Sequence, residues 1–187
     1  MKRAVLTTGA NSGIGLATAL QLARRGFRSI GSVRSEAKAT AVHEAAAEAQ
    51  VEVETVLLDV TDAAGCQRVV QQVGPLYGLV NNAGYGGAGA VEEVSDEEAR
   101  HMLETMVVAP ARLARLALHG MREQGGGRIV NVSSIFGLTT APLSGWYQAC
   151  KHALEGISDA LRMELAGEGV QVVLVEPGGI RTGIWDE

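Results

Sequence analysis

The chain has 187 residues, of which 47% are hydrophobic and 4% are aromatic, and its formal net charge is −5. This length predicts one domain spanning 1–187, in which a chain buries roughly 70% of its unfolded surface. The acidic balance and scattered basic residues argue against a nucleic-acid-binding protein, and no apolar run approaches the ~18 residues that a membrane-spanning helix needs.

A glycine-rich turn joins the first predicted strand to the first predicted helix. The apolar run at 4–6 is typical of a buried parallel strand, and 14–25 carries apolar residues on more than one side of a helix. Backbone N–H groups of the turn between them would bind a phosphate or pyrophosphate at the positive end of the helix. Gly9 would make the tight turn, Gly13 would let a ligand approach, and Gly15 would let the helix pack closely. The alternative is a turn without a ligand, but its place between strand and helix favours a dinucleotide.

Strands and helices then alternate to the end of the chain. Further strands are predicted at 27–33, 51–58, 76–80, 128–132 and 170–175. Helices are predicted at 35–50, after a cap at Thr61 or Asp62, at 95–122 and at 146–165. Ser95 and Glu98 match a capping box, and Pro110 should bend the long helix or mark a break inside it.

This alternation predicts βαβ units with right-handed crossovers, in an α/β fold of three layers with helices on both faces of a parallel sheet. A phosphate turn after the first strand favours the doubly wound Rossmann order 3-2-1-4-5-6. Ligands of such sheets bind beyond the carboxyl ends of the strands. Four polar or glycine-rich signals fall there, namely Asp59, 81–84, 133–134 and 177–182, and they should converge on one cleft.

The cysteines and histidines show no pattern of a disulfide framework or of a metal site. Cys66 and Cys150 lie far apart without a CxxC motif, and the four histidines share no ligand spacing. The N-terminus enters a predicted strand at once, which leaves no room for a signal peptide. We therefore expect two reduced thiols, no metal and a cytoplasmic location.

Tyr147 and Lys151 stand four residues apart on a predicted helix, so their side chains share one face. The spacing alone is weak, and an ordinary surface pair is the alternative. A phenol with a pKa of about 10 is a poor proton carrier at neutral pH, but a nearby ammonium stabilises the phenolate. Ser134 could donate a second hydrogen bond to a carbonyl oxygen bound by Tyr147. Beside a hydride carrier, such a pair of donors suits the reduction of a carbonyl.

Six motifs together resemble the short-chain dehydrogenase/reductase family and extend from Thr7 to Thr182. They are TGANSGIG, the pair Asp59–Val60, NNAG, Ser134 thirteen residues before Tyr147, YQACK and PGGIRT. The resemblance implies that Tyr147 is the acid/base and that Ser134 orients and polarises the substrate oxygen. It implies that Lys151 holds the ribose hydroxyls and lowers the pKa of Tyr147. Ser133 has the less suitable spacing of the two serines.

The resemblance also implies a coenzyme site along the strand ends. Asp59 and Val60 would flank the adenine, Asn81, Ala83 and Gly84 would lie beside the central part, and Pro177, Gly178 and Thr182 would meet the nicotinamide carboxamide. The predicted coenzyme-binding residues are Gly9, Asn11, Ser12, Gly13, Ile14, Gly15, Arg34, Asp59, Val60, Asn81, Ala83, Gly84, Tyr147, Lys151, Pro177, Gly178 and Thr182.

NADP(H) is favoured over NAD(H) by the end of the second strand. Enzymes of this fold that prefer NAD place an acidic side chain there to hold the ribose 2′-OH. Here the position reads Ser32-Val33-Arg34, without a carboxylate and with a guanidinium able to bind a 2′-phosphate. The alternative for Arg34 is a solvated surface charge.

The chain departs from the family pattern in two places. Many members carry an asparagine in the long helix, where it supports a proton relay, and that position is Met106 here. The family normally continues with a segment that covers the substrate, a last strand and a last helix, whereas this sequence ends at Glu187. Residues 184–187 resemble the start of that segment, so we expect further chain in the full protein.

The predicted function is an NADP(H)-dependent oxidoreductase that interconverts a carbonyl and a secondary alcohol. An apolar pocket wall of Phe136, Leu138, Leu143 and Trp146 would favour a lipophilic substrate, with ordinary packing as the alternative. A coenzyme-binding sensor or scaffold with little turnover is the alternative function, motivated by Met106 and the early end. A methyltransferase is more distant, since it gives no reason for the pair of tyrosine and lysine.

Self-association into a homodimer or homotetramer is expected through the fourth and fifth helices. These helices carry more apolar residues than one face of a sheet requires. The residues that suggest this are Leu113, Leu116, Leu154 and Ile157.

Overall fold

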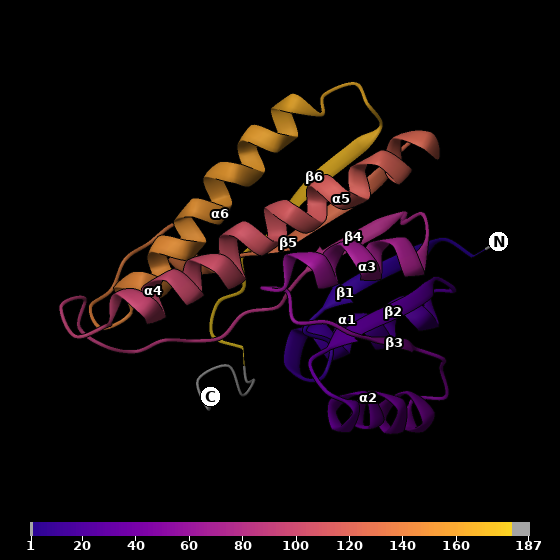
Figure 1. Cartoon of the computed structure of the whole chain (residues 1–187), viewed down its shortest axis with the longest axis horizontal. Coiled ribbons are helices and arrows are strands. Elements are labelled where there is room, and N and C mark those ends of the chain that lie inside the picture. The colour runs from indigo at the N-terminus through magenta and orange to yellow at the C-terminus, as the bar shows by residue number, and fades with distance from the viewer. Residues whose placement is uncertain (1, 181–187) are drawn as a thin grey trace.

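The computed structural model describes residues 2–180, whose strands form a six-stranded parallel sheet (Figure 1). The strands are β1 (Ala4–Thr8), β2 (Arg28–Val33), β3 (Glu54–Leu57), β4 (Gly78–Asn81), β5 (Gly127–Val132) and β6 (Val170–Val175). Their order across the sheet is β3-β2-β1-β4-β5-β6, and every neighbouring pair is parallel. The predicted doubly wound order is therefore confirmed.

Helices make the connections between the strands. They are α1 (Gly13–Arg24), α2 (Glu36–Glu48), α3 (Ala63–Val73), α4 (Asp96–Leu103), the π-helix η1 (Glu104–Val108), α5 (Ala109–Glu123), the 3₁₀-helix η2 (Ile135–Gly137) and α6 (Gly145–Glu164). Of the two residues proposed to cap α3, Asp62 takes that role, accepting a hydrogen bond from the backbone N–H of Ala64 (3.0 Å). Ser95 caps α4 through the N–H of Glu98 (3.2 Å), as the capping box predicts.

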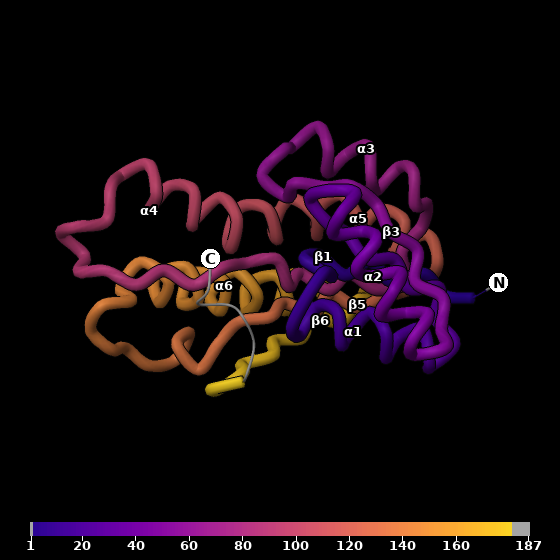
Figure 2. Tube along the Cα trace, turned by 90° about the horizontal axis from the view of Figure 1, so that it is seen from below, coloured from indigo at the N-terminus to yellow at the C-terminus, as the bar shows by residue number. Residues whose placement is uncertain are grey.

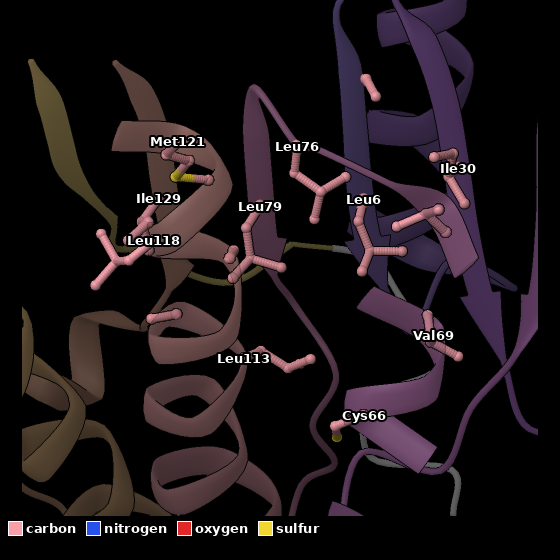
Figure 3. Close-up of a cluster of buried hydrophobic side chains, with 14 of the residues drawn as sticks. Leu6, Ile30, Cys66, Val69, Leu76, Leu79, Leu113, Leu118, Met121 and Ile129 are labelled. Atoms are coloured by element: carbon pink, nitrogen blue, oxygen red, sulfur yellow. The ribbon is translucent and has the colours of Figure 1, made fainter. Parts of the chain in front are cut away.

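Successive side chains of β1 point to opposite faces of the sheet. Leu6 points into a core formed with α3 and α5, where Val69 and Leu113 are among its partners (Figure 3). Val5 lies in a second cluster with Ile14 and Leu22 of α1 on the other face. Because successive side chains of a strand point to opposite faces, a continuous apolar strand must be covered on both sides. The three predicted layers follow from this.

The predicted break in the long helix is present just before Pro110. The π-helix η1 separates α4 from α5, and Pro110 stands at the second residue of α5, directly after the π-helix. Figure 2 shows α4 and the start of α6 at the same end of the molecule, and the two helices contact each other. The break therefore lies beside the helix that carries Tyr147.

Two strands begin two or more residues later than predicted. The expected strand at 51–58 is shorter, because the N–H of Val51 instead bonds to the carbonyl of Ala46 and completes the end of α2 (3.0 Å). The expected strand at 76–80 is shifted, since Leu76 packs in the core before β4 begins at Gly78.

The surface predicted for self-association is partly wrong. Leu113 and Leu154 are both buried within the chain itself, because the faces that carry them pack inward. Leu116 is half-buried against the same core, and Ile157 is exposed. Two of the four residues are therefore unavailable to a second subunit.

Some predictions fall on residues that the structure does not describe. Thr182 and the segment 184–187 lie outside residues 2–180. Within the described part of the chain, no helix is both long and apolar enough to cross a membrane.

Candidate active site

A cleft of about 380 Å³ opens at the carboxyl ends of the strands, as the strand order predicts. It brings together the glycine turn, the end of β2, the loops after β3, β4 and β5, the start of α6 and the turn after β6. The predicted site residues that line it are Gly9, Asn11, Ser12, Gly13, Ile14, Arg34, Asp59, Val60, Ala83, Gly84, Ser134, Tyr147, Lys151, Pro177 and Gly178.

The glycine turn exposes backbone rather than side chains to the cleft. Gly9 and Gly13 have φ angles of 63° and 52°, in the left-handed region that favours glycine. Gly15 lies behind the turn, where an added Cβ would approach the carbonyl oxygen of Gly9 to 2.2 Å. Gly15 therefore allows α1 to pack against the turn and is not among the residues that line the cleft.

Thr8 joins this turn to the loop after β4. Its hydroxyl oxygen accepts hydrogen bonds from the backbone N–H groups of Asn82 and Ala83 (both 2.9 Å). The side-chain amide of Asn82 donates to the carbonyl oxygens of Thr8 and Gly9 (2.9 and 3.2 Å). Asn82 lines the cleft, and the sequence analysis had not selected it.

Asn81, which the sequence analysis did select, is buried behind the cleft wall. Its side-chain amide donates to the side-chain oxygen of Asn131 on β5 (2.8 Å), and Asn131 donates to the hydroxyl of Ser158 on α6 (2.8 Å). This chain links β4, β5 and the helix of Tyr147. Its role in the structure is to position these elements, because buried polar groups need such partners.

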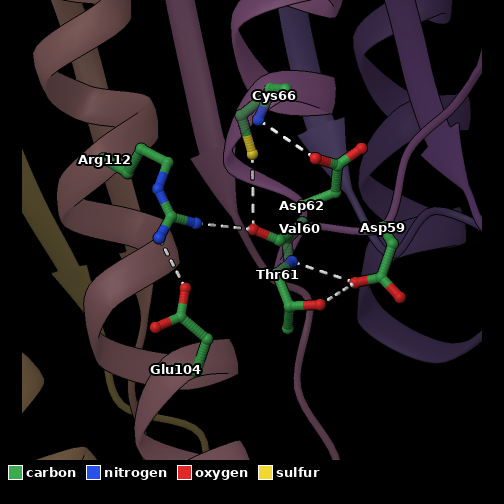
Figure 4. Close-up of polar contacts among 8 residues, drawn as sticks. Asp59, Val60, Thr61, Asp62, Cys66, Glu104 and Arg112 are labelled. Carbon is green, nitrogen blue, oxygen red and sulfur yellow. Dashed lines mark hydrogen bonds and ion pairs between the residues drawn. The ribbon is translucent and has the colours of Figure 1, made fainter.

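The loop after β3 is held by side chains on both sides (Figure 4). Asp59 accepts hydrogen bonds from the backbone N–H and hydroxyl of Thr61 (2.9 and 2.7 Å), and these lower the pKa of its carboxyl group. Arg112 donates to the carbonyl of Val60 (3.1 Å) and to Glu104 of η1 (2.5 Å). Arg112 therefore fixes the loop that carries Asp59 and Val60 to the long broken helix.

Ser134 and Tyr147 meet at the other end of the cleft. Ser134 follows β5, and its hydroxyl oxygen accepts a hydrogen bond from the N–H of Phe136 (3.1 Å). The ring of Phe136 meets the ring of Tyr147 edge to face at 6.4 Å between centroids. Burial raises the pKa of Tyr147, and its hydrogen bond with Ser134 opposes that shift.

This direction differs from the lowered pKa that the family resemblance implied for Tyr147. The side chain is 4% exposed, and removing a phenolate from water costs more free energy than the neighbouring groups return. A raised pKa keeps the phenol protonated, which is the form that can donate a proton to a carbonyl oxygen.

Lys151 lies one turn along α6 from Tyr147. Its ammonium nitrogen is 5.5 Å from the centre of the Tyr147 ring and donates to the carbonyl of Val132 (2.9 Å). The residue is 5% exposed, and burial lowers its pKa to about 8. The ammonium therefore loses its proton closer to neutral pH than an ordinary lysine.

Several residues of the cleft were missed by the sequence analysis. Lys38 lies in the first turn of α2, four residues after Arg34, so its position in the sequence close to the predicted cation was the signal that could have found it. The rings of Tyr85 and His101 lie 5.8 Å apart between centroids and are tilted by 34°, and no local signal joins residues so far apart in the sequence. The others are Ser32, Val33, Leu58, Thr61, Thr105, Val132 and Ile135, whereas Gly179 and Ile180 belong to the segment 177–182 that was expected at the cleft.

The apolar residues proposed for the substrate wall divide into two groups. Phe136 lines the cleft, and Trp146 packs in the cluster that contains Tyr147. Leu138 and Leu143 are 61% and 62% exposed and lie outside the cleft lining of the described residues.

The cleft has the features of a site for an elongated anionic cofactor. Positive φ angles at Gly9 and Gly13 leave backbone N–H groups at the start of α1, and Arg34 and Lys38 place cations at one end. The residues suited to proton transfer lie at the opposite end. In the described part of the chain, no group of three or more histidine, cysteine or acidic side chains could hold a metal ion.

Comparisons with known proteins agree with this arrangement. The family model described as short chain dehydrogenase matches residues 3–187. Oxidoreductase YusZ of Bacillus subtilis is 40% identical over 189 residues, which cover 98% of this chain and 67% of YusZ. The NADPH-dependent 3-dehydrocapnine reductase of Ornithobacterium rhinotracheale is 36% identical, with 98% of this chain and 67% of that protein covered.

Solved structures show the same similarity. A crystal structure of F189W actinorhodin polyketide ketoreductase with NADPH has a TM-score of 0.91 and 36% identity, covering 97% of this chain and 72% of that one. Similar solved structures include some with NADP and others with NAD. This chain spans about two-thirds of the length of the curated relatives it matches. It belongs to the short-chain dehydrogenase/reductase family of oxidoreductases.

Proposed function

We propose that this protein uses NADP(H) to interconvert a ketone and a secondary alcohol on a lipophilic small molecule. The observation that carries the proposal is the meeting of Ser134, Tyr147 and Lys151 at one end of a cleft whose other end is the glycine turn. The glycine turn would hold the phosphates of a dinucleotide, and Tyr147 would lie at the end of the cleft where its reactive ring is expected.

The residues of the chain supply the acid and the orientation of the substrate. A bound NADPH would supply the hydride for the reduction. The hydroxyl of Tyr147 donates its proton to the carbonyl oxygen, and the hydroxyl of Ser134 donates a second hydrogen bond to the same oxygen. Lys151 holds a positive charge beside Tyr147 and stabilises the phenolate that remains.

The choice of NADP(H) rests on the charges at the end of β2. Arg34 and Lys38 both line the cleft there, and the strand ends in Ser32-Val33 without a carboxylate. A guanidinium and an ammonium suit a 2′-phosphate, whereas a carboxylate would hold a free 2′-hydroxyl. The name of the 3-dehydrocapnine reductase, which includes NADPH, points the same way.

The choice of a lipophilic ketone rests on the lining near Tyr147. Tyr85 and Phe136 line the cleft and pack in the cluster that contains Tyr147, which gives that end an apolar surface and favours an apolar substrate. Two similar proteins are named 3-dehydrocapnine reductase and 3-ketodihydrosphingosine reductase. Both names describe a reduction, which agrees with the proposed direction of the reaction.

The test is to mix the purified protein with NADPH and ketones of increasing chain length, and to follow the loss of NADPH absorbance. Turnover that rises with chain length and exceeds turnover with NADH is expected. Equal rates with NADH would contradict the coenzyme preference, and equal rates with short polar ketones would contradict the substrate class.

A coenzyme-binding sensor or scaffold is the second candidate, favoured by Met106. Its buried side chain lies against Gly84, 3.3 Å from where a Cβ on that glycine would be, and its thioether cannot donate a hydrogen bond. NADPH binding by fluorescence titration, without oxidation by any ketone or alcohol, would support this candidate over the enzyme.

A further inference from the structure

The loop at 59–61, between β3 and α3, forms part of the cleft wall beside the end of β2. All three of its residues line the cleft. Val33 and Leu57 are paired in the sheet, so Arg34 and the loop follow the ends of two neighbouring strands. The contacts that hold this loop therefore determine the shape of the cleft at the end where Arg34 lies.

The carbonyl oxygen of Val60 is held by two helices. It accepts a hydrogen bond from the thiol of Cys66 on α3 (3.3 Å) and another from the guanidinium of Arg112 on α5 (3.1 Å) (Figure 4). Burial raises the pKa of the Cys66 thiol, so the sulfur keeps the proton that it donates. The bond from Arg112 fixes the loop to a helix that lies 52 positions later in the chain.

Arg112 is itself oriented by Glu104 of η1. A second nitrogen of the guanidinium donates to the Oε1 atom of Glu104 at 2.5 Å, and the two side chains are 14% and 33% exposed. This hydrogen bond raises the pKa of Arg112, so the guanidinium keeps its charge. Because a guanidinium is planar, fixing one nitrogen also fixes the direction of the other. Glu104 therefore directs the donor that reaches Val60.

The position of α5 depends on apolar contacts rather than on Arg112. Leu113, Ala117 and Met121 of this helix are all buried in the core cluster that contains Leu6. A buried apolar face supplies most of the stability of a helix in a protein. In the loop, Val60 lies in that core, whereas Asp59 is exposed. Loss of Arg112 should therefore displace the loop more than the helix.

We infer that Arg112 is a positioning residue for coenzyme binding, because it holds the loop at 59–61 in the cleft wall through the carbonyl of Val60. Arg112 is not among the described residues that line the cleft, so it acts through the loop. The inference rests on the proposed function, in which a dinucleotide occupies the cleft. Its effect falls on the adenine end, beside Arg34, and leaves the end at Tyr147 unchanged.

The test measures the affinity for each half of the coenzyme separately. Adenosine 2′,5′-bisphosphate carries the adenine and the 2′-phosphate, and reduced nicotinamide mononucleotide carries the reactive ring. In Arg112→Met, the dissociation constant of the bisphosphate should rise by about five- to tenfold, since a hydrogen bond from a charged donor is lost. The dissociation constant of the mononucleotide should stay within about twofold of the parent. Calorimetry and fluorescence titration measure the two constants.

Turnover gives a second form of the same comparison. The KM for NADPH should rise in Arg112→Met, while kcat at saturating NADPH stays within about twofold of the parent, because Tyr147 lies at the opposite end of the cleft. The matched control is Arg115→Met, which removes an exposed arginine of the same helix. Its dissociation constants and KM should equal those of the parent.

Two milder variants test the geometry and keep the test open if Arg112→Met does not fold. Arg112→Lys keeps the charge without the planar pair of donors, so the affinity for the bisphosphate should be intermediate. Glu104→Gln should weaken it less than Arg112→Met does. The double variant Arg112→Met/Glu104→Gln should bind no more weakly than Arg112→Met alone, because Glu104 acts through Arg112. Additive losses would overturn that assignment of Glu104.

Urea unfolding of each variant separates positioning from a general structural role. A variant that is less stable and binds both halves of the coenzyme equally weakly overturns the inference. A selective loss of the bisphosphate supports it.

The outcomes also separate this inference from the proposed function. A parent protein that binds neither half of the coenzyme overturns both. A parent that binds the bisphosphate but oxidises no NADPH with any ketone overturns the proposed reaction, and the comparison of Arg112→Met with the parent still decides the role of Arg112. A parent that turns over, with the same affinity for the bisphosphate in Arg112→Met, overturns the role of Arg112 alone.

Discussion

The two ends of the cleft are built in opposite ways. At the glycine turn, backbone groups and partly exposed side chains face the cleft, and their geometry follows from local features such as the positive φ angles of Gly9 and Gly13. At the start of α6, Tyr147 and Lys151 are buried, and their protonation depends on what other elements place around them. We therefore expect the first end to bind a coenzyme through its shape, and the second to perform proton transfer with pKa values that burial sets.

Removing the hydroxyl group of Tyr147 should have the largest effect, and it should change turnover without changing the binding of coenzyme at the other end of the cleft. Tyr147→Phe is expected to reduce kcat by about 10²–10⁴-fold, because the general acid is lost, while NADPH affinity stays within about twofold of the parent. Stopped-flow reduction and fluorescence titration measure the two quantities. Tyr85→Phe, another tyrosine of the cleft lining, is the matched control. Near-normal turnover of Tyr147→Phe would refute its role.

The opposite end is tested by Arg34→Ala. A charge-assisted hydrogen bond to a phosphate contributes about 1.5–3 kcal/mol, so NADPH affinity should fall by about tenfold or more while NADH affinity changes little. Dissociation constants for both coenzymes check this. Arg25→Ala, an exposed arginine at the end of α1, serves as the control. An unchanged ratio of the two constants would contradict the assignment of NADP(H).

A paired glycine substitution tests the packing of the turn. Gly15→Ala should destabilise the protein by about 1–3 kcal/mol, because its Cβ would meet the Gly9 carbonyl at 2.2 Å, and should weaken NADPH binding. Gly156→Ala, on α6 with no atom within 4 Å of the new Cβ, should instead stabilise by up to about 1 kcal/mol. Urea unfolding gives both values. Equal effects would mean that the turn tolerates a side chain.

The last prediction concerns the pH dependence of stability. Burial lowers the pKa of Lys151 from 10.5 to about 8, so between these values the unfolded chain holds a proton that the folded protein lacks. Stability should therefore gain a rising contribution from pH 8 to 10.5, and Lys151→Met should remove it. Thermal unfolding across this range measures the change, with exposed Lys2→Met as control. A rise that persists in Lys151→Met would assign it to other groups.

Local pattern was enough for the elements and for most of the cleft. The apolar strands, the glycine turn and the alternation of helices and strands predicted the order β3-β2-β1-β4-β5-β6, since each is a short-range property of the chain. The resemblance to the short-chain dehydrogenase/reductase family added the roles of Ser134, Tyr147 and Lys151, which the structure brings together in the cleft. Those roles remain predictions.

Contacts between distant parts of the chain determine which residues of a predicted segment are buried and which line the cleft. Asn81 and Asn82 are adjacent in sequence, yet one is buried against Asn131 and the other joins Thr8 to the cleft wall. Successive side chains at the end of a strand point to opposite faces of the sheet, so Asn81 and Asn82 point in different directions. The neighbouring strands determine which of these directions faces the cleft.

The sequence by itself determined the doubly wound sheet and the place of its cleft, because strand periodicity and glycine spacing act over a few residues. The tertiary structure was needed for the direction of the pKa shift of Tyr147 and for the inward position of Leu113. Each of these depends on burial, which is set by elements far apart in the chain. Desolvation depends on everything that surrounds a group, and no local pattern contains that information.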